Sequence, residues 1–187
     1  MEELILASGS PRRKELLTLA GIPFTIETAE VEETFEASWT PAEVVLHLSA
    51  LKARAVSARH PGRTVLGADT IVALDGEILG KPADREDAFR MLRTLSGRTH
   101  EVYTGVCITD GTKEDRFFER TEVTFFDLTD EEIRAYVETG EPLDKAGAYG
   151  IQGRGIVLVK SVTGDFPNVI GLPVGVVKKR LASGFFH

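Results

Sequence analysis

The sequence predicts a mixed α/β protein of α+β character, folded around one mixed sheet. Short apolar runs typical of strands alternate along the chain with longer, capped segments typical of helices. Two turn signals, at Asp75-Gly76 and around Asp110-Gly111, each join consecutive strand patterns and predict antiparallel hairpins. We therefore do not expect a doubly wound parallel sheet.

The first expected elements are a strand over residues 4–6, a helix over 11–20 and a strand over 24–28. Ser10 is a favourable helix N-cap, and the proline that follows it suits the first helical position. Gly21 provides the stop signal of this helix.

A second helix is expected to begin after Thr40 and to end before His60. Thr40-Pro41-Ala42-Glu43 is a capping box with proline at the first helical position. The apolar stripe of this helix comprises Val44, Val45, Leu48, Leu51 and Ala55. Lys52 falls within the angular range of the stripe. Two interpretations of Lys52 stay open: its stem packs while its ammonium reaches water, or its ammonium points inward at a cleft.

The remaining elements follow from the same kinds of signal. A strand over residues 64–74 is expected to be interrupted at Gly67–Thr70, and then to turn into a return strand over 77–79. Asp84 caps the next helix, which ends at Ser96-Gly97. Further on we expect strands over 100–109 and 116–128, a helix from the capping box at Thr129 to 139–140, an irregular segment over 141–154, a strand pair over 155–162 and 168–172, and a closing helix over 174–181.

The composition, with 42% hydrophobic and 27% charged residues, is that of an ordinary globular protein. No apolar run approaches the roughly 18 residues of a membrane span. The single cysteine, Cys107, fits a reducing cytoplasm and is expected to fill the core. A formal charge of −7 argues against indiscriminate binding to nucleic acid or anionic membrane. We expect a cytoplasmic protein with no nucleic-acid or membrane partner, in which any anion site is local.

Arg12 and Arg13 fall in the first turn of the first helix, where the helix dipole disfavours each cation by roughly 0.3–1 kcal/mol. A bound anion would reverse the sign of this effect. Free backbone N–H groups, a nearby glycine (Gly9) and two guanidinium groups together suggest a phosphate-binding loop. The alternative is a solvated basic turn whose charges are screened.

Asp69 is the strongest catalytic candidate, because a carboxylate in so apolar a strand is costly unless it is paired or binds metal. In an ideal hairpin Lys81 lies on the opposite face from Asp69, so a shared site requires a bulge at Gly80. Glu33, in an acidic loop, offers a second carboxylate. Mg²⁺ is often held by one or two carboxylates together with substrate phosphates.

Gln152 offers an amide that can pair with uracil or thymine and, after rotation, with cytosine. Other nucleotide and nucleophile motifs are absent. The chain contains no G-x-x-x-x-G-K-[ST] phosphate-binding motif, no G-x-G-x-x-G dinucleotide motif and no G-x-S-x-G nucleophile elbow.

Several short stretches, spread over nearly the whole chain, carry a more specific signal. They are Leu6–Arg13, Lys52-Ala53, Gly67–Thr70, Gly80–Pro82, Leu95–Gly97, Asp144–Gly153 and Gly171–Pro173. Taken in order, they resemble the Maf family of nucleoside triphosphate pyrophosphatases. The resemblance implies an inosine-triphosphatase-like fold, an elongated mixed sheet with a central cleft and flanking helices. Residues 1–187 would then form a single domain, compatible with two lobes around that cleft.

The same resemblance implies hydrolysis of a nucleoside triphosphate between the α- and β-phosphates, with a divalent metal, Mg²⁺ or Mn²⁺. The implied substrates are dTTP and UTP, with CTP and modified pyrimidine nucleotides as further candidates. A homodimer is implied in the same way. A sister branch acting on 7-methylguanosine triphosphate is less similar, because it carries tryptophan where this sequence has Arg12.

The resemblance also implies roles for individual residues. Asp69 is similar to the general base that activates water, and Glu33 joins it as a metal carboxylate. The implied phosphate-binding residues are Ser8, Arg12, Arg13, Lys52 and Lys81. The positions that match those choosing uracil and thymine nucleotides are Arg12, Thr70 and Gln152.

Two other functions stay open. A sugar nucleotidyltransferase also expels pyrophosphate but needs a phosphosugar acceptor, and its fuller loop signature is missing here. A nucleotide-sensing protein linked to septum formation and cell division would use the phosphate site without needing Asp69.

Overall fold

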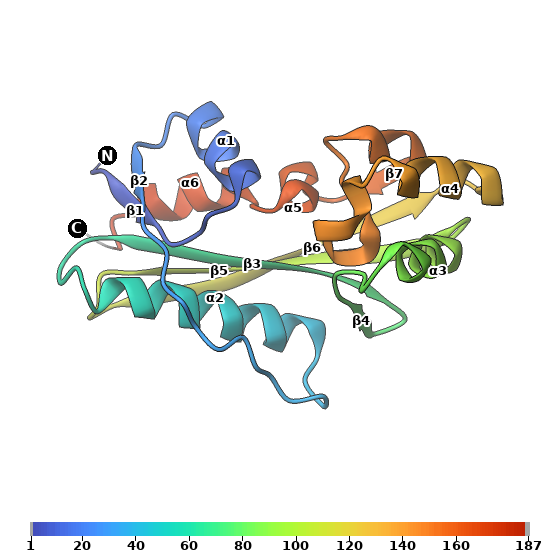
Figure 1. Cartoon of the computed structure of the whole chain (residues 1–187). Coiled ribbons are helices and arrows are strands. Elements are labelled where there is room, and N and C mark those ends of the chain that lie inside the picture. The colour runs from blue at the N-terminus through green and yellow to red at the C-terminus, as the bar shows by residue number, and fades with distance from the viewer. Residues whose placement is uncertain (1, 186–187) are drawn as a thin grey trace. The chain divides into compact units, whose positions relative to one another are not determined.

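A computed structural model describes residues 2–185 of the chain (Figure 1). The expected single domain over residues 1–187 thus includes Met1, Phe186 and His187, which lie outside the described residues. The described strands form one seven-stranded sheet in the order β2-β1-β3-β5-β6-β7, and β4 pairs with β3. The pairing is parallel for β1 with β2 and β3, and antiparallel for β3 with β4 and for β6 with β7. The predicted mixed α/β class is confirmed.

The strands are β1 (Leu4–Leu6), β2 (Phe24–Ile26), β3 (Val65–Leu74), β4 (Glu77–Leu79), β5 (Thr99–Thr109), β6 (Glu114–Phe125) and β7 (Val159–Thr163). The α-helices are α1 (Pro11–Leu19), α2 (Pro41–Ser57), α3 (Arg85–Leu95), α4 (Asp130–Glu138), α5 (Phe166–Ile170) and α6 (Val174–Ala182). The 3₁₀ turns η1 (Glu141–Asp144) and η2 (Ala146–Ala148) lie in the segment expected to be irregular. The turn η3 (Arg154–Leu158) occupies the first part of the strand predicted over residues 155–162, so that prediction is wrong for residues 155–158 and holds only from Val159. The capping boxes predicted at Thr40 and Thr129 are both formed.

The chain divides into two compact units. The first comprises the described residues of Met1–Thr70, Thr104–Glu119 and Gly171–His187, and the second comprises Ile71–Tyr103 and Arg120–Ile170. Within the first unit, α2 covers one face of the sheet, and α1 and α6 lie on the other (Figure 1). No helix among residues 2–185 combines the length and the apolar character that crossing a bilayer requires.

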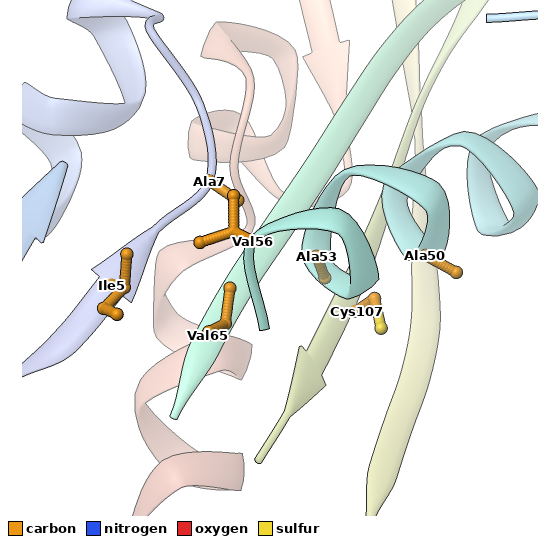
Figure 2. Close-up of a cluster of buried hydrophobic side chains, with 7 residues drawn as sticks. All are labelled: Ile5, Ala7, Ala50, Ala53, Val56, Val65 and Cys107. Atoms are coloured by element: carbon orange, nitrogen blue, oxygen red, sulfur yellow. The ribbon is translucent and has the colours of Figure 1, made fainter. Parts of the chain in front are cut away.

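The first unit has a hydrophobic cluster made largely of small side chains (Figure 2). Its members are Ile5, Ala7, Ala50, Ala53, Val56, Val65 and Cys107. Cys107 is fully buried, as predicted, and burial raises the pKa of its thiol to about 12. The predicted stripe of α2 is wrong at Leu51 and Ala55, which are only half-buried. The buried face turns instead toward Ala50 and Ala53.

Glycines in β3 and β5 explain why this face of α2 is the buried one. A Cβ at Gly67 would collide with the carbonyl oxygen of Ser49 and lie 2.7 Å from the nitrogen of Ala53. A Cβ at Gly105 would collide with the carbonyl oxygen of Val45. The helix backbone therefore lies directly against the strands. The predicted interruption of the strand at Gly67–Thr70 is wrong, because β3 is continuous and its glycine serves helix packing.

The second unit begins with the predicted hairpin. Asp75 and Gly76 both have positive φ, 51° and 82°, as a two-residue type I′ turn requires. Pairing runs from Leu74 opposite Glu77 to Val72 opposite Leu79. The bulge predicted at Gly80 is absent, because β4 ends before this residue, whose carbonyl instead accepts the N–H of Gly147 at 3.2 Å.

The strand predicted over residues 168–172 is wrong, because α5 occupies most of this segment. The Asp165 carboxylate accepts the backbone N–H of Asn168 at 2.8 Å, a local bond that starts a helical turn. The buried Asn168 amide then donates to the carbonyl of Val102 at 3.1 Å and to Thr121 Oγ1 at 2.9 Å. Side-chain hydrogen bonds to distant strands thus outweigh the apolar pattern of this segment.

The core of the second unit contains a buried histidine. His100 is 1% exposed, and its Nε2 lies 2.6 Å from the hydroxyl of Tyr149. Its ring packs edge to face against Phe125 and Tyr149. Burial lowers the pKa of His100 to about 4, from an ordinary value of 6.5. The folded protein therefore holds a neutral imidazole there at neutral pH.

This lowered pKa predicts a loss of stability in mild acid. The unfolded chain binds a proton at His100 below pH 6.5, whereas the folded chain does so only near pH 4. The free energy of unfolding is expected to be unaffected by His100 above pH 6.5 and to fall by about 1.4 kcal/mol per pH unit between these values. Urea denaturation across this range, for the wild type and His100→Gln, measures the effect. Equal pH slopes in the two proteins would contradict it.

Candidate active site

The first unit has a pocket of about 520 Å³ beside the loop that follows β1. Its wall is formed by Ala7, Ser8, Gly9, Thr28, Ala29, Glu30, Val31, Glu33 and Lys52. Among residues 2–185, and apart from its chain neighbours, a Cβ placed at Gly9 would have within 4 Å only Thr28 Cγ2, at the ordinary contact distance of 3.8 Å. Protein packing therefore does not demand a glycine at this position. Its small size leaves room for a ligand to approach the backbone of the loop.

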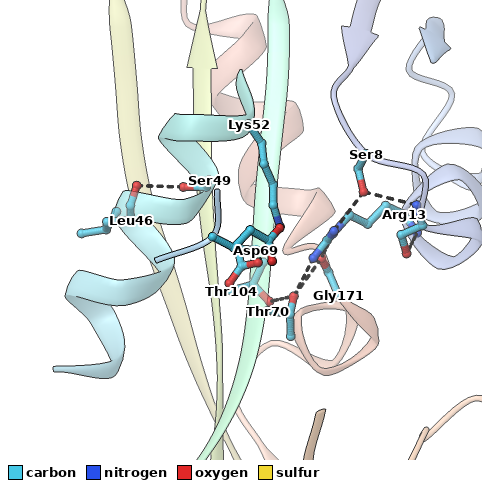
Figure 3. A network of polar contacts seen from close by, with 11 residues as sticks. Ser8, Arg13, Leu46, Ser49, Lys52, Asp69, Thr70, Thr104 and Gly171 are labelled. Carbon is cyan, nitrogen blue, oxygen red and sulfur yellow. Dashed lines mark hydrogen bonds and ion pairs between the residues drawn. The ribbon is translucent and has the colours of Figure 1, made fainter. Parts of the chain in front are cut away.

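Lys52, in the wall of this pocket, contacts two carboxylates, of which Glu33 also lines the pocket. Its Nζ lies 2.7 Å from Asp69 Oδ1 and 2.8 Å from Glu33 Oε1. Lys52 comes from α2 and Asp69 from β3, and their side chains are 18% and 12% exposed (Figure 3). Of the two interpretations of Lys52, the structure supports the inward-pointing ammonium. Glu33 is 52% exposed, so solvent weakens its ion pair.

Arg13 is the centre of a second group of polar contacts (Figure 3). Its Nε donates to the carbonyl of Gly171 at 2.8 Å, and its two terminal nitrogens donate to Ser8 Oγ and Thr70 Oγ1, each at 3.0 Å. Burial lowers the pKa of Arg13, and the nearby charge of Asp69 partly offsets this. The guanidinium thus connects the loop after β1, strand β3 and Gly171, the residue that follows α5.

Thr70 links Arg13 to Thr104, a residue that sequence reasoning missed. Its hydroxyl lies 2.9 Å from Thr104 Oγ1 and 3.3 Å from the carbonyl of Gly171. Thr104 is fully buried. A threonine close to Val102, Val106 and Cys107 in a predicted strand is a signal that could have pointed to it. Its partner on β3 could not be identified without the pairing of the strands.

Comparison with known proteins places this chain in a family. A family model described as Maf-like protein matches residues 3–183. The chain belongs to the Maf family. It is 55% identical over 181 residues to proteins named dTTP/UTP pyrophosphatase from Bacillus mycoides (strain KBAB4) and Bacillus cytotoxicus, covering 97% of this chain and 95% of theirs.

The fold of this Maf chain also resembles a solved structure, that of the Staphylococcus aureus Ham1 protein. The TM-score is 0.55 at 17% sequence identity, and the match covers 97% of this chain and 98% of the other. This likeness concerns the fold alone, and it confirms the predicted inosine-triphosphatase-like fold.

The other predicted site residues of the Maf chain lie in both units. Arg12 is half-buried in the first turn of α1. Lys81, just after β4, and Gln152, between η2 and η3, belong to the second unit, and both are exposed. Convergence of Lys81 and Gln152 on Asp69 stays a prediction from the sequence.

The carboxylates of this Maf site suit a metal that binds together with substrate. Among residues 2–185 no group of three or more His, Cys, Asp or Glu side chains could hold a metal ion. Lys52 approaches Oδ1 of Asp69 and Oε1 of Glu33, and each carboxylate has a second oxygen besides. Two such oxygens, completed by phosphate oxygens and water, fit the chemistry of Mg²⁺.

Proposed function

We propose that this Maf protein hydrolyses dTTP and UTP to the nucleoside monophosphate and pyrophosphate. The observation that carries the proposal is the buried Asp69 carboxylate, held by Lys52, whose side chain lines a polar pocket. Relatives that are 55% identical over nearly their whole length are named dTTP/UTP pyrophosphatases. CTP and modified pyrimidine nucleotides are further candidate substrates.

Asp69 is the proposed general base. Lys52 donates to Oδ1, which orients the carboxylate and leaves Oδ2 to accept a proton from water. The oxygen of that water forms a bond to the α-phosphorus. The bond from the α-phosphorus to the oxygen bridging the α- and β-phosphates then breaks, and pyrophosphate leaves.

Cationic groups are proposed to bind and position the phosphates, because phosphoryl substitution depends on charge neutralisation and positioning. The proposed phosphate-binding residues are Ser8, Arg12, Arg13, Lys52 and Lys81. Asp69 and Glu33 would hold Mg²⁺ or Mn²⁺ together with the substrate; when bound, the metal neutralises phosphate charge and polarises the reacting group. Arg12, Thr70 and Gln152 are proposed to select the pyrimidine base.

The proposal also covers the domain organisation, the cellular compartment and the partners of the protein. We infer one catalytic domain over residues 1–187, acting in the cytoplasm without a nucleic-acid partner and able to form a homodimer. The single buried cysteine supports the cytoplasmic setting, and the net charge of −7 supports the lack of a nucleic-acid partner. Light scattering during size-exclusion chromatography measures the oligomeric state.

The test is a panel of dTTP, UTP, CTP, ATP, GTP and 7-methylguanosine triphosphate, with Mg²⁺, Mn²⁺ or EDTA, and with pyrophosphate and orthophosphate measured separately. Pyrophosphate release from dTTP and UTP is expected, falling at least about a hundredfold in EDTA. Orthophosphate alone would contradict cleavage between the α- and β-phosphates. Tight binding without turnover would favour the nucleotide sensor, and pyrophosphate release only with a phosphosugar would favour the nucleotidyltransferase.

A further inference from the structure

Gln152 lies in a turn, residues 150–155, whose C-terminal end is held in place by a single carboxylate. Glu141, in η1, accepts the backbone N–H of Arg154 through Oε2 at 2.9 Å. Its other oxygen, Oε1, accepts the backbone N–H of Gly155 at 3.1 Å. Both amides follow Gln152 closely in the chain, so one side chain fixes the C-terminal end of the turn.

Tyr136, in α4, connects the same carboxylate to the start of the turn. Its hydroxyl donates to Glu141 Oε1 at 2.8 Å and accepts the N–H of Gly150 at 3.1 Å. Burial raises the pKa of Tyr136, so the hydroxyl keeps its proton for this bond. Glu141 and Tyr136 together therefore hold both ends of the turn and leave the Gln152 side chain exposed.

The glycines of the turn make room for these contacts. A Cβ at Gly153 would lie 2.5 Å from both carboxylate oxygens of Glu141. A Cβ at Gly155 would lie 2.5 Å from the carbonyl of Gly150 and 2.7 Å from the Tyr136 hydroxyl. Neither glycine has a positive φ, so close packing and not backbone conformation accounts for them. The turn is built around the Glu141 carboxylate.

Electrostatics supports the same arrangement. Burial raises the pKa of Glu141, but hydrogen bonds from Arg154, Tyr136 and Gly155 outweigh it and bring the pKa below its usual range. A carboxylate accepting charge-assisted bonds from backbone amides is a strong anchor. A glutamine could not replace it, since its NH₂ group would face one of the donors.

We propose that Glu141 is a positioning residue for base recognition, which fixes the 150–155 turn so that Gln152 presents its amide to the pyrimidine. The proposal rests on the proposed function and on the role given to Gln152 there. Glu141 touches no substrate in this scheme and acts only through the turn.

Glu141→Gln and Tyr136→Phe test the proposal, and Glu138→Gln is the matched control. Glu138 is a surface glutamate of α4, 71% exposed and paired with Arg85. Glu141→Gln is expected to raise the KM for dTTP and UTP about tenfold with kcat within about twofold, because it removes a hydrogen bond to a charged group but leaves the reacting residues in place. The preference for dTTP and UTP over purine triphosphates falls with it, and Glu138→Gln leaves both unchanged.

Hydrogen exchange supplies a readout that does not depend on turnover. The amides of Arg154 and Gly155 are expected to exchange at least about tenfold faster in Glu141→Gln than in the wild type. Adding Glu141→Gln to Gln152→Ala is expected to cost no further base selectivity, because both changes act on one contact. Unchanged exchange and unchanged selectivity in Glu141→Gln and Tyr136→Phe would overturn the proposal.

The two proposals fail in different ways. A wild type that releases no pyrophosphate from any triphosphate refutes the proposed function. Protection of the two amides then still decides whether Glu141 holds the turn, and unprotected amides overturn its positioning role. A wild type that is active and selective, with Glu141→Gln equally selective, overturns the positioning role alone.

Discussion

Replacing Asp69 by asparagine is expected to lower pyrophosphate release from dTTP and UTP about a thousandfold, with the fold intact. An amide cannot accept a proton from water at neutral pH, so the proposed base is lost. The asparagine carbonyl can still accept the hydrogen bond from Lys52 that Asp69 Oδ1 accepts at 2.7 Å. Steady-state release assays measure the activity, and circular dichroism with urea denaturation measures the fold.

Asp75→Asn is the matched control for this substitution. Asp75 lies in the hairpin turn and pairs with Arg98 on the surface, where it is 73% exposed. Asparagine tolerates the positive φ of Asp75 as well as aspartate does. The control is expected to retain full activity. Release by Asp69→Asn within a few fold of the wild type would remove Asp69 from the mechanism.

Arg13→Ala is expected to lower the free energy of unfolding by about 3 kcal/mol, the second large effect. The guanidinium donates to Gly171, Ser8 and Thr70, and alanine leaves these partly buried oxygens short of a donor. The same change should reduce kcat/KM for every triphosphate alike, because the loop after β1 loses its support. Thermal and urea denaturation, followed by the substrate panel, measure both effects.

Arg12→Ala provides the comparison, since it removes the same group one position earlier. Arg12 is half-buried and its helix position is set by the Ser10 cap, not by its own side chain. Stability is expected to change by less than about 0.5 kcal/mol, while base preference changes. Equal losses of stability in the two variants, or a loss in Arg13→Ala that depends strongly on the base, would contradict this division between the neighbouring arginines.

Local signals in the sequence predicted local structure well. The Ser10 cap and the proline after it place Arg12 and Arg13 in the first turn of α1, as expected. Helix position alone, however, gives both arginines the same role. The partner that distinguishes them, Gly171, is 158 residues away from Arg13, and no periodicity reports such a contact.

Lys52 shows a similar limit of prediction from the sequence. The angular position of its side chain on α2 was predictable, but the choice between solvent and cleft depends on what the helix faces. Asp69 became a partner only because Gly67 lets α2 lie directly against β3. The strand prediction for residues 168–172 was wrong for a related reason. The Asn168 amide donates hydrogen bonds to Val102 and Thr121, and no local sequence pattern reveals such distant partners.

The close packing of α2 against the sheet limits which substitutions the sequence of this protein can accept. Gly67 and Gly105 are buried inside strands, yet a single added carbon at either would push α2 outward and carry Lys52 with it. Because Gly67 and Gly105 have no side chain beyond a hydrogen atom, α2 lies close enough to the sheet for the Lys52 ammonium to reach the Asp69 carboxylate. Substitutions at these two glycines would lower activity, as changes to the reacting groups do. Surface loops tolerate substitution, whereas these two buried positions do not.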